Sequence, residues 1–340
     1  MEQAGQRRRA ATLKDVAALA GVSVATASKA LNGRDQVRAE TRSRVLEAAQ
    51  RISFTPNSVA RGLLAGQTGT VGLLTNDLVG RFSIPILMGA EDAFGTGKTS
   101  VLLCDARGDS IRESYHLQAL LSRRVDGLIV VGSDTDPRPS LGDMPVPVVY
   151  AYGPSEDPND LSLVPDNVGA GSLMARHLLE TGRSRIAHIT GEAGYSAARD
   201  RTEGITRALD AAGLSLLGGE ALYGSWSEAW GRAAAAVIID RHPDVDALLC
   251  GSDQIARGAL DALRDRGIPV PEKIAVAGFD NWEVLATGSR PQLTSIDMDL
   301  EVLGRTAAQR LFAAIDGQHD SGTQKLPCRL VVRGSTVPDP

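Results

Sequence analysis

The run TLKDVAALAGVSVATASKALN, which begins at Thr12, constrains this chain more than any other segment. Its apolar spacing predicts two short helices joined by a tight turn. The Thr12 hydroxyl can cap the first helix, and Asp15, three residues later, completes a capping box. Gly21 ends that helix, because glycine enters the left-handed conformation at low energetic cost. Ser23 then caps the second helix.

The predicted second helix, over residues 24–31, turns small side chains inward and leaves a different set outward. Ala27, Ala30 and Leu31 face the first helix on helical spacing. The outward positions carry short polar, apolar and cationic side chains, namely Val24, Ala25, Thr26, Ser28 and Lys29. This arrangement suits a helix that enters the major groove of DNA. An ordinary helical hairpin is the simpler alternative.

The charge distribution also favours a nucleic-acid partner for the N-terminal part. The whole chain has a net charge of −5, yet its first 63 residues hold eleven Lys or Arg and five Asp or Glu. This is a head of about +6 on a remainder of about −11. A basic head fits contact with phosphate groups, and an acidic remainder favours solubility.

Composition bounds the class of protein. A length of 340 residues, 43% hydrophobic and 23% charged, is typical of a soluble protein of two or three domains. No apolar run is long enough to span a bilayer, and no signal-peptide segment follows Arg7, Arg8 and Arg9, so we expect a cytoplasmic protein that does not contact membranes. Cys104, Cys250 and Cys328 lack metal-ligand spacing. We therefore expect no metal, cofactor or disulfide framework.

The chain divides into three predicted parts. A third helix is expected over residues 39–51, with an apolar side at Val45, Leu46, Ala48, Ala49 and Ile52. A short helix over 58–64 follows, too short to be stable alone and weakened by Gly62. We assign a helix-turn-helix DNA-binding domain to residues 1–55, a short helix and linker to 56–69, and a two-lobe domain to 70–340.

The third part alternates apolar strands with amphipathic helices, which predicts doubly wound α/β lobes with parallel sheets. Strands are expected at 71–75, 100–104, 127–131, 146–151, 185–190, 247–251 and 274–278. Helices are expected at 110–123, 169–181, 198–212, 227–241, 253–266 and 300–316. The alternation restarts near 161–167, which indicates two similar lobes. Ligands bind beyond the carboxyl ends of such strands, so we expect a site in the cleft between the lobes.

The chain resembles the LacI/GalR family of bacterial transcriptional repressors over nearly its whole length. The resemblance is carried by the run from Thr12, by PNSVARGL from Pro56 and by TVGLL from Thr70. It implies that the all-α head and a hinge helix within residues 56–69 bind DNA. It also implies that residues 70–340, similar to periplasmic sugar-binding proteins, form the effector-binding and dimerisation domain. The positions it assigns to DNA contact are Thr12, Ser23, Val24, Ala25, Thr26, Ser28, Lys29, Asn32, Asn57, Ala60 and Leu63.

Within the segment from Pro56, the resemblance implies that paired hinge helices of a dimer lie in the minor groove at the operator centre. Leu63 falls at the position that wedges between base pairs and kinks the duplex, and Ala60 falls beside it. A core leucine in a linker is the simpler interpretation of Leu63. Because Gly62 makes the hinge a poor isolated helix, we expect it to order only on cognate DNA.

Three positions match recurrent effector contacts of the family: Arg199, Trp226 and Asp280. A guanidinium, a carboxylate and a flat indole favour a saccharide. An ion pair of Arg199 with Asp280 and a core role for Trp226 are the structural alternatives. Further candidates are Asp77, Arg81 and Phe82 in the loop after the first strand, and Ser252 and Asp253 after a later one. The first loop lacks the Asn-Pro-Phe common in the family, and Ser252 replaces a frequent Asn.

Other functions receive less support from the sequence. An enzyme would fit an α/β body, but Gly95-Thr-Gly-Lys-Thr lacks the spacing of a phosphate loop, and the chain has no nucleophile elbow. A solute-binding protein would not need the basic head. We predict a homodimeric repressor that binds a pseudo-palindromic operator and is relieved by a small saccharide; a corepressor-dependent regulator with a non-sugar effector is the alternative. The C-terminus has no heptads, which favours a dimer over a tetramer.

Overall fold

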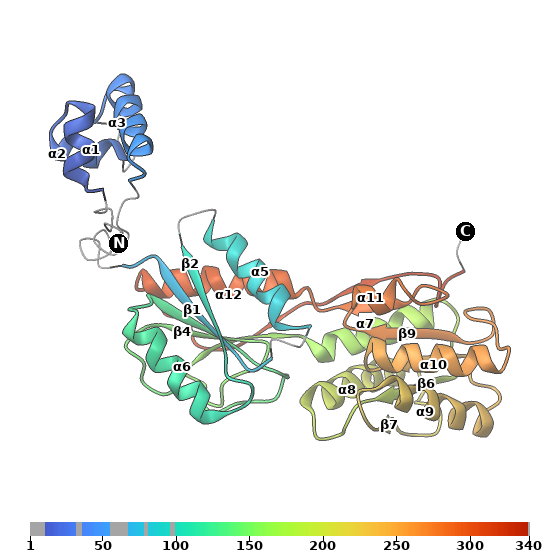
Figure 1. The fold of residues 1–340 in the computed structure, drawn as a ribbon. Coiled ribbons are helices and arrows are strands. Elements are labelled where there is room, and N and C mark those ends of the chain that lie inside the picture. The colour runs from blue at the N-terminus through green and yellow to red at the C-terminus, as the bar shows by residue number, and fades with distance from the viewer. Residues whose placement is uncertain (1–10, 32–35, 55–66, 78–80, 96–98, 339–340) are drawn as a thin grey trace, which may run out of the picture. The chain divides into compact units, whose positions relative to one another are not determined.

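A computed structural model of the chain describes residues 11–31, 36–54, 67–77, 81–95 and 99–338 (Figure 1). The chain forms two compact units, residues 1–68 and 69–340, called here the head unit and the core unit. Among the described residues, no helix combines the length and apolar character needed to cross a membrane.

The head unit is built on α1 (Leu13–Ala20), α2 (Val24–Leu31) and α3 (Ala39–Arg51). The predicted capping box is confirmed, because Asp15 N donates to Thr12 Oγ1 at 3.4 Å and Thr12 N donates to Asp15 Oδ2 at 2.8 Å. Gly21 ends α1 in the left-handed conformation at φ +65°. Ser23 Oγ accepts from Thr26 N at 3.1 Å and so caps α2. Local hydrogen bonds thus fix both ends of the turn.

The core of the head unit consists of small residues, as the sequence predicts. Ala27 and Ala30 of α2 are buried against Val16, Ala17 and Ala20 of α1 and against Val45, Ala48 and Ala49 of α3. Leu46 differs from expectation, since the residue remains 49% exposed. It follows Val45 on the helix and points away from the narrow stripe that three short helices can bury.

The first lobe of the core unit is a six-stranded parallel sheet in the order β11-β5-β4-β3-β1-β2. Its strands are β1 (Thr70–Thr75), β2 (Ser100–Asp105), β3 (Gly127–Val131), β4 (Val148–Ala151), β5 (Leu161–Pro165) and β11 (Gly322–Leu326). Its helices are α5 (Ser83–Phe94), α6 (Ser110–Ser122) and α12 (Leu300–Ile315). α12 packs on α5 and on β3 to β5, whereas α6 covers β1 and β2.

The second lobe has a sheet in the order β12-β10-β9-β8-β6-β7, which is parallel except for β12. The strands are β6 (Ile186–Thr190), β7 (Leu222–Tyr223), β8 (Ala247–Cys250), β9 (Ala275–Phe279), β10 (Thr294–Asp297) and β12 (Arg329–Val331). Its helices are α7 (Asn167–Glu180), α8 (Ser196–Ala211), α9 (Glu228–Arg241), α10 (Asp253–Asp265) and α11 (Glu283–Ala286). α7 pairs with α8, and α9 pairs with α10.

The chain passes between the lobes three times, after β5, after β10 and after β11 (Figure 1). The two-lobe doubly wound architecture is therefore confirmed, but neither lobe is a continuous stretch of sequence. α12 and β11, from the end of the chain, complete the first lobe. The sequence does not predict β11, because its residues GTQKL are polar and only half-buried.

Glycines set the distance between the paired helices. A Cβ added to Gly304 on α12 would lie 2.0 Å from the Ile86 carbonyl oxygen of α5, and one added to Gly89 would lie 1.8 Å from the Glu301 carbonyl oxygen. The same reciprocal contact between a glycine and a backbone carbonyl recurs at Gly171 with Gly204 and at Gly231 with Gly258. All three helix pairs therefore pack backbone against backbone.

Candidate DNA-binding surface and effector cleft

The outward side of α2 carries the predicted DNA-contacting residues of the head unit. Val24, Ala25 and Lys29 are exposed, and Thr26 and Ser28 are half-buried. Thr12 and Ser23 form the helix caps described above. The other residues assigned to DNA contact lie outside the described residues, namely Asn32, Asn57, Ala60 and Leu63.

The core unit has a cavity of about 230 Å³ between its lobes, at the carboxyl ends of the parallel strands. Loops after β1, β3 and β4 line it from the first lobe, and the start of α8, the loop after β7 and the loop after β9 line it from the second. The lining residues are Arg81, Phe82, Ser133, Asp134, Thr135, Tyr152, Tyr195, Ala197, Arg201, Trp226 and Asp280. We call this cavity the first chamber.

Arg201 is the guanidinium of the second lobe in the first chamber, and its side chain is only 3% exposed. Its Nε donates to Asn167 Oδ1 at 2.9 Å, and its Nη1 donates to the Gly251 carbonyl at 2.5 Å. The guanidinium carbon also lies 3.6 Å from the centre of the Phe279 ring. These contacts hold the buried guanidinium in place beside the cavity.

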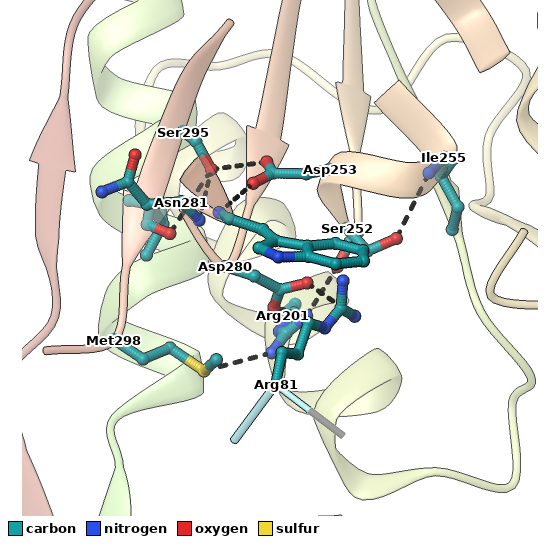
Figure 2. Close-up of polar contacts among 12 residues, drawn as sticks. Arg81, Arg201, Ser252, Asp253, Ile255, Asp280, Asn281, Ser295 and Met298 are labelled. Carbon is teal, nitrogen blue, oxygen red and sulfur yellow. Dashed lines mark hydrogen bonds and ion pairs between the residues drawn. The ribbon is translucent and has the colours of Figure 1, made fainter. Parts of the chain in front are cut away.

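Asp280 lies between two guanidinium groups (Figure 2). Its Oδ2 is 3.0 Å from Arg81 Nη2, and its Oδ1 is 3.7 Å from Arg201 Nη1. Burial raises the pKa of the Asp280 carboxyl, and the guanidinium groups of Arg81 and Arg201 oppose this increase. The residue has φ +101°, a strained backbone conformation that commonly marks functional sites. Since Arg81 belongs to the first lobe, its ion pair with Asp280 bridges the cleft.

Arg199 requires a correction. Its side chain is 52% exposed, donates to the carbonyls of Ala193 and Gly194, and lies 3.8 Å from Asp136. It does not line the first chamber as an effector contact would, and it does not form the alternative ion pair with Asp280, which Arg201 makes instead. Two residues along α8 correspond to a rotation of about 200°, so the helix presents one guanidinium to the cavity and the other to solvent.

Aromatic rings form the apolar walls of the first chamber. Trp226 meets Tyr195 edge to face, with ring centres 6.1 Å apart. Its indole lies directly against the backbone of Gly191. A Cβ added to Gly191 would lie 2.0 Å from the Trp226 ring atom Cε2. On the opposite lobe, Phe82 stacks on Tyr152 with ring centres 4.7 Å apart. Trp226 and Phe82, both predicted effector contacts, thus line the cavity.

Tyr152 was not expected from the sequence. It follows β4 directly, is 3% exposed, and has φ +73°, which is unusual for a bulky residue. Burial raises the pKa of its hydroxyl, which therefore stays protonated. The sequence feature that could have indicated Tyr152 is its position directly after a buried strand, which is also the position of Asp280 after β9.

Three other predicted effector contacts line neither this cavity nor the one described next. Ser252 is buried and caps α10 by accepting from Ile255 N at 3.3 Å. Asp253 is buried and accepts from Ser295 Oγ at 2.6 Å and from Trp282 N at 2.7 Å (Figure 2). Asp77 N donates to Thr75 Oγ1 at 3.1 Å, at the end of β1. Asp253 holds the loop that carries Asp280 rather than facing the cleft.

A second cavity, of about 380 Å³, adjoins the first and shares Arg81, Phe82 and Asp280 with it. We call it the second chamber. Its remaining lining residues come from the start of α5, the loop after β9 and the crossings between the lobes: Pro85, Asn281, Trp282, Glu283, Asp297, Asp299, Leu300, Glu301 and Arg329. Among the described residues, no three His, Cys, Asp or Glu side chains are placed to hold a metal ion.

A helix-turn-helix unit joined to a two-lobe core with a polar and aromatic cleft defines a ligand-responsive DNA-binding protein. Comparison with known families agrees with this class. Residues 12–57 match the bacterial regulatory proteins of the lacI family, and residues 175–336 match a periplasmic binding protein-like domain. The chain belongs to the LacI family, and it is a DNA-binding transcriptional regulator.

Relatives and solved structures span almost the whole chain. The HTH-type transcriptional regulator CelR of Thermobifida fusca is 36% identical over 337 residues, covering 96% of this chain and 97% of the relative. The HTH-type transcriptional repressor PurR of Aliivibrio fischeri (strain MJ11) is 32% identical, covering 96% and 98%.

Among solved structures, the lac repressor dimer bound to operator and the anti-inducer ONPF is similar at a TM-score of 0.76 and 28% identity, covering 96% of this chain and 99% of that one. A CelR–cellobiose complex is similar at a TM-score of 0.66 and 31% identity, with the same coverage of each chain.

Proposed function

We propose that this regulator represses carbohydrate-utilisation genes and that a saccharide bound between its lobes relieves the repression. The observation that carries the proposal is the first chamber, where Trp226, Arg201 and Asp280 converge. An indole face packs on the apolar face of a sugar ring. A carboxylate and guanidinium groups together accept from and donate to neighbouring hydroxyls. The similarity to CelR, solved with cellobiose, supports a saccharide.

The head unit is proposed to bind a pseudo-palindromic operator as part of a homodimer, since two-fold protein symmetry is mirrored in the DNA site. The lac repressor, which is similar to this chain, is a dimer on its operator. Val24 and Ala25 offer only apolar contacts, as to a thymine methyl, whereas Thr26, Ser28 and Lys29 can reach base edges or phosphates. The domain boundaries at residues 55 and 69, and the roles of Asn57, Ala60 and Leu63 in the hinge, belong to the same proposal.

The effector is proposed to act by binding with different affinity to two arrangements of the lobes. A ligand shifts an equilibrium only by its difference in affinity for the two states. Arg81 of the first lobe and Asp280 of the second meet in the cleft. A sugar that hydrogen-bonds to both groups changes the contacts between the lobes, and thereby the free energy of operator binding.

Fluorescence anisotropy tests the proposal directly. The full-length protein is titrated onto DNA from upstream of its own gene, with and without a panel of saccharides, at several salt concentrations. We expect tight binding that depends on an inverted repeat and that one saccharide weakens. Lys29→Ala should weaken binding about tenfold or more and lower the salt dependence. Lys273→Ala, an equal change of charge on the exposed surface of the core unit, is the matched control.

Two other results would change the conclusion. If a purine or another non-sugar metabolite strengthens operator binding, the protein is a corepressor-dependent regulator and the saccharide assignment is wrong. If binding is equally weak on all sequences and falls steeply with salt, the tested DNA contains no operator or the assignment of the α2 surface is wrong.

A further inference from the structure

The cleft holds two adjoining chambers whose shared lining includes the ion pair of Arg81 with Asp280. Arg81, Phe82 and Asp280 line both cavities, so the contact between Arg81 Nη2 and Asp280 Oδ2 at 3.0 Å lies at their common boundary. Figure 2 shows the two side chains meeting beside Arg201. The two chambers therefore adjoin at this ion pair.

The first chamber has room for one sugar ring. A buried cavity of about 150 Å³ is known to accept one benzene ring. A cavity of about 230 Å³ accommodates one six-membered ring with its hydroxyl groups, and a second ring would exceed it. The adjoining 380 Å³ provides space for at least one more ring.

The second chamber repeats the chemistry of the first. Trp282 provides an indole, which the Arg81 guanidinium covers at 4.9 Å from the ring centre. The backbone N of Trp282 donates to Oδ2 of the buried Asp253, which fixes the backbone position of Trp282. A carboxylate and a guanidinium are also present, since Asp297 and Arg329 line the chamber and Asp297 Oδ2 accepts from Arg329 Nη2 at 2.7 Å. Each chamber thus pairs one indole with carboxylate and guanidinium groups.

The boundary between the chambers has unused hydrogen-bonding capacity. Arg81 Nη1 is buried and has no hydrogen-bond partner among the described residues. Asp280 Oδ2 lies in a side chain that is only 4% exposed, and it accepts no well-aligned hydrogen bond from the described residues despite the ion pair. Buried groups of this kind are normally satisfied, so a donor and an acceptor are expected from a ligand at this point. A hydroxyl beside a glycosidic bond provides both.

We infer that the effector is a saccharide of at least two rings, with one ring on Trp226 in the first chamber and the next on Trp282 in the second. The ion pair of Arg81 with Asp280 contacts the junction between the rings. This inference rests on the proposed saccharide effector and adds its length. Trp282 becomes the residue that selects a disaccharide over its component monosaccharides.

Isothermal titration calorimetry on the full-length protein tests the inference. The probes are cellobiose, maltose, lactose and sucrose, each compared with its component monosaccharides. We expect one disaccharide to bind at least tenfold more tightly than either component. Trp282→Ala should remove most of this gain, about tenfold in Kd, and should change the Kd of the monosaccharide less than twofold. Trp282→Phe should keep most of the gain, whereas Trp226→Ala should weaken both ligands.

The outcomes separate the two proposals. If a monosaccharide binds as tightly as every disaccharide containing it, or if Trp282→Ala weakens both equally, the two-ring effector is wrong and the saccharide effector stands. If no saccharide of the panel binds while a non-sugar metabolite does, both proposals are wrong. Thermal unfolding temperatures of Trp282→Ala and Trp282→Phe that match the wild-type value confirm that both variants are folded.

Discussion

The two lobes have the same architecture but different edges at the cleft. Each lobe has a six-stranded sheet and helices paired through glycines. The edge of the second lobe is a buried network in which Arg201, Asp253 and Asp280 are held by hydrogen bonds and ion pairs. The edge of the first lobe instead presents Phe82 stacked on Tyr152, and the partly exposed Arg81. The cleft edge of the second lobe is therefore held in place by its own hydrogen bonds. The cleft edge of the first lobe contributes contacts that can be lost without breaking such a network.

This difference has an energetic meaning. A buried charge that loses its partner costs several kcal/mol, whereas a partly exposed one is solvated when the partner is removed. Residues of the second-lobe edge should therefore affect both folding and ligand binding. Residues of the first-lobe edge should affect ligand binding with little change in stability.

The largest effect is expected from Arg201→Met. It leaves Asp280 with one cationic partner and removes the hydrogen bonds to Asn167 and to the Gly251 carbonyl. We expect a loss of about 3–5 kcal/mol in the free energy of unfolding, measured by urea denaturation with tryptophan fluorescence. Arg199→Ala, on the exposed side of the same helix, is the control and should change stability by less than about 0.5 kcal/mol. Equal losses in the two variants would contradict the buried network.

The paired glycines should matter equally in both lobes. Gly304→Ala in the first lobe and Gly204→Ala in the second each place a Cβ within 2.0 Å of a backbone carbonyl oxygen. A backbone atom cannot move aside as a flexible side chain does, so we expect each substitution to cost about 3 kcal/mol. Gly194→Ala, where a Cβ meets nothing within 4 Å, is the control for both. A large cost in only one lobe would show that the helix pairs are not equivalent.

The buried position of His188 in β6 predicts a pH dependence of the stability of the protein. The Nδ1 atom of His188 lies 2.8 Å from the Leu249 carbonyl, and burial lowers the pKa of the imidazole to about 4. Between pH 6.5 and 4 the unfolded chain binds more protons than the folded one, so stability falls as pH falls. His188 should contribute a loss of about 2 kcal/mol between pH 7 and pH 5.

His188→Asn tests this contribution, because its amide can donate to the same carbonyl without titrating. Urea unfolding at pH 7 and pH 5 should show a smaller decrease in stability for the variant than for the wild type. Burial also raises the pKa of the Asp253 and Asp280 carboxyls, which act with the opposite sign. The difference between variant and wild type isolates His188. If the free energy of unfolding changes equally between pH 7 and pH 5 in the variant and in the wild type, the imidazole is not buried in the neutral form.

The smallest change in stability is expected from Arg81→Met. Its side chain is 20% exposed, and the Asp280 carboxyl keeps Arg201 as a partner. We expect a loss of about 1 kcal/mol in the free energy of unfolding, because Arg201 still neutralises the buried Asp280 carboxylate. Effector affinity should nevertheless fall about tenfold in calorimetry. A loss of stability comparable to that of Arg201→Met would remove the distinction between the two edges.

The sequence predicts most of the fold because local signals and periodicity agree. The caps at Thr12, Gly21 and Ser23 are each visible in a few consecutive residues, and the structure confirms them. Buried parallel strands such as β3 are continuous apolar runs, which sequence patterns identify well. The strands β11 and β12 are different, since their place depends on partners far away in the chain.

The site is less predictable because its geometry depends on helix rotation and on loops. Arg199 and Arg201 are equivalent in the sequence, and only the packing of α8 decides which one enters the cleft. Asp253 follows a strand as Asp280 does, yet it is buried by hydrogen bonds to Ser295 and to the backbone of Trp282. A position after a strand therefore predicts proximity to the cleft but does not predict whether a side chain faces it.

The three crossings between the lobes have a consequence for synthesis on the ribosome. Strand β5 ends at Pro165, but its neighbour β11 ends only at Leu326. At about 5–20 residues per second, roughly 10–30 s pass between the emergence of these two segments. During this interval the nascent first lobe lacks both α12 and one edge strand. The half-made chain exposes an unpaired strand edge and an uncovered apolar sheet face, and it would be a natural substrate for ribosome-associated chaperones.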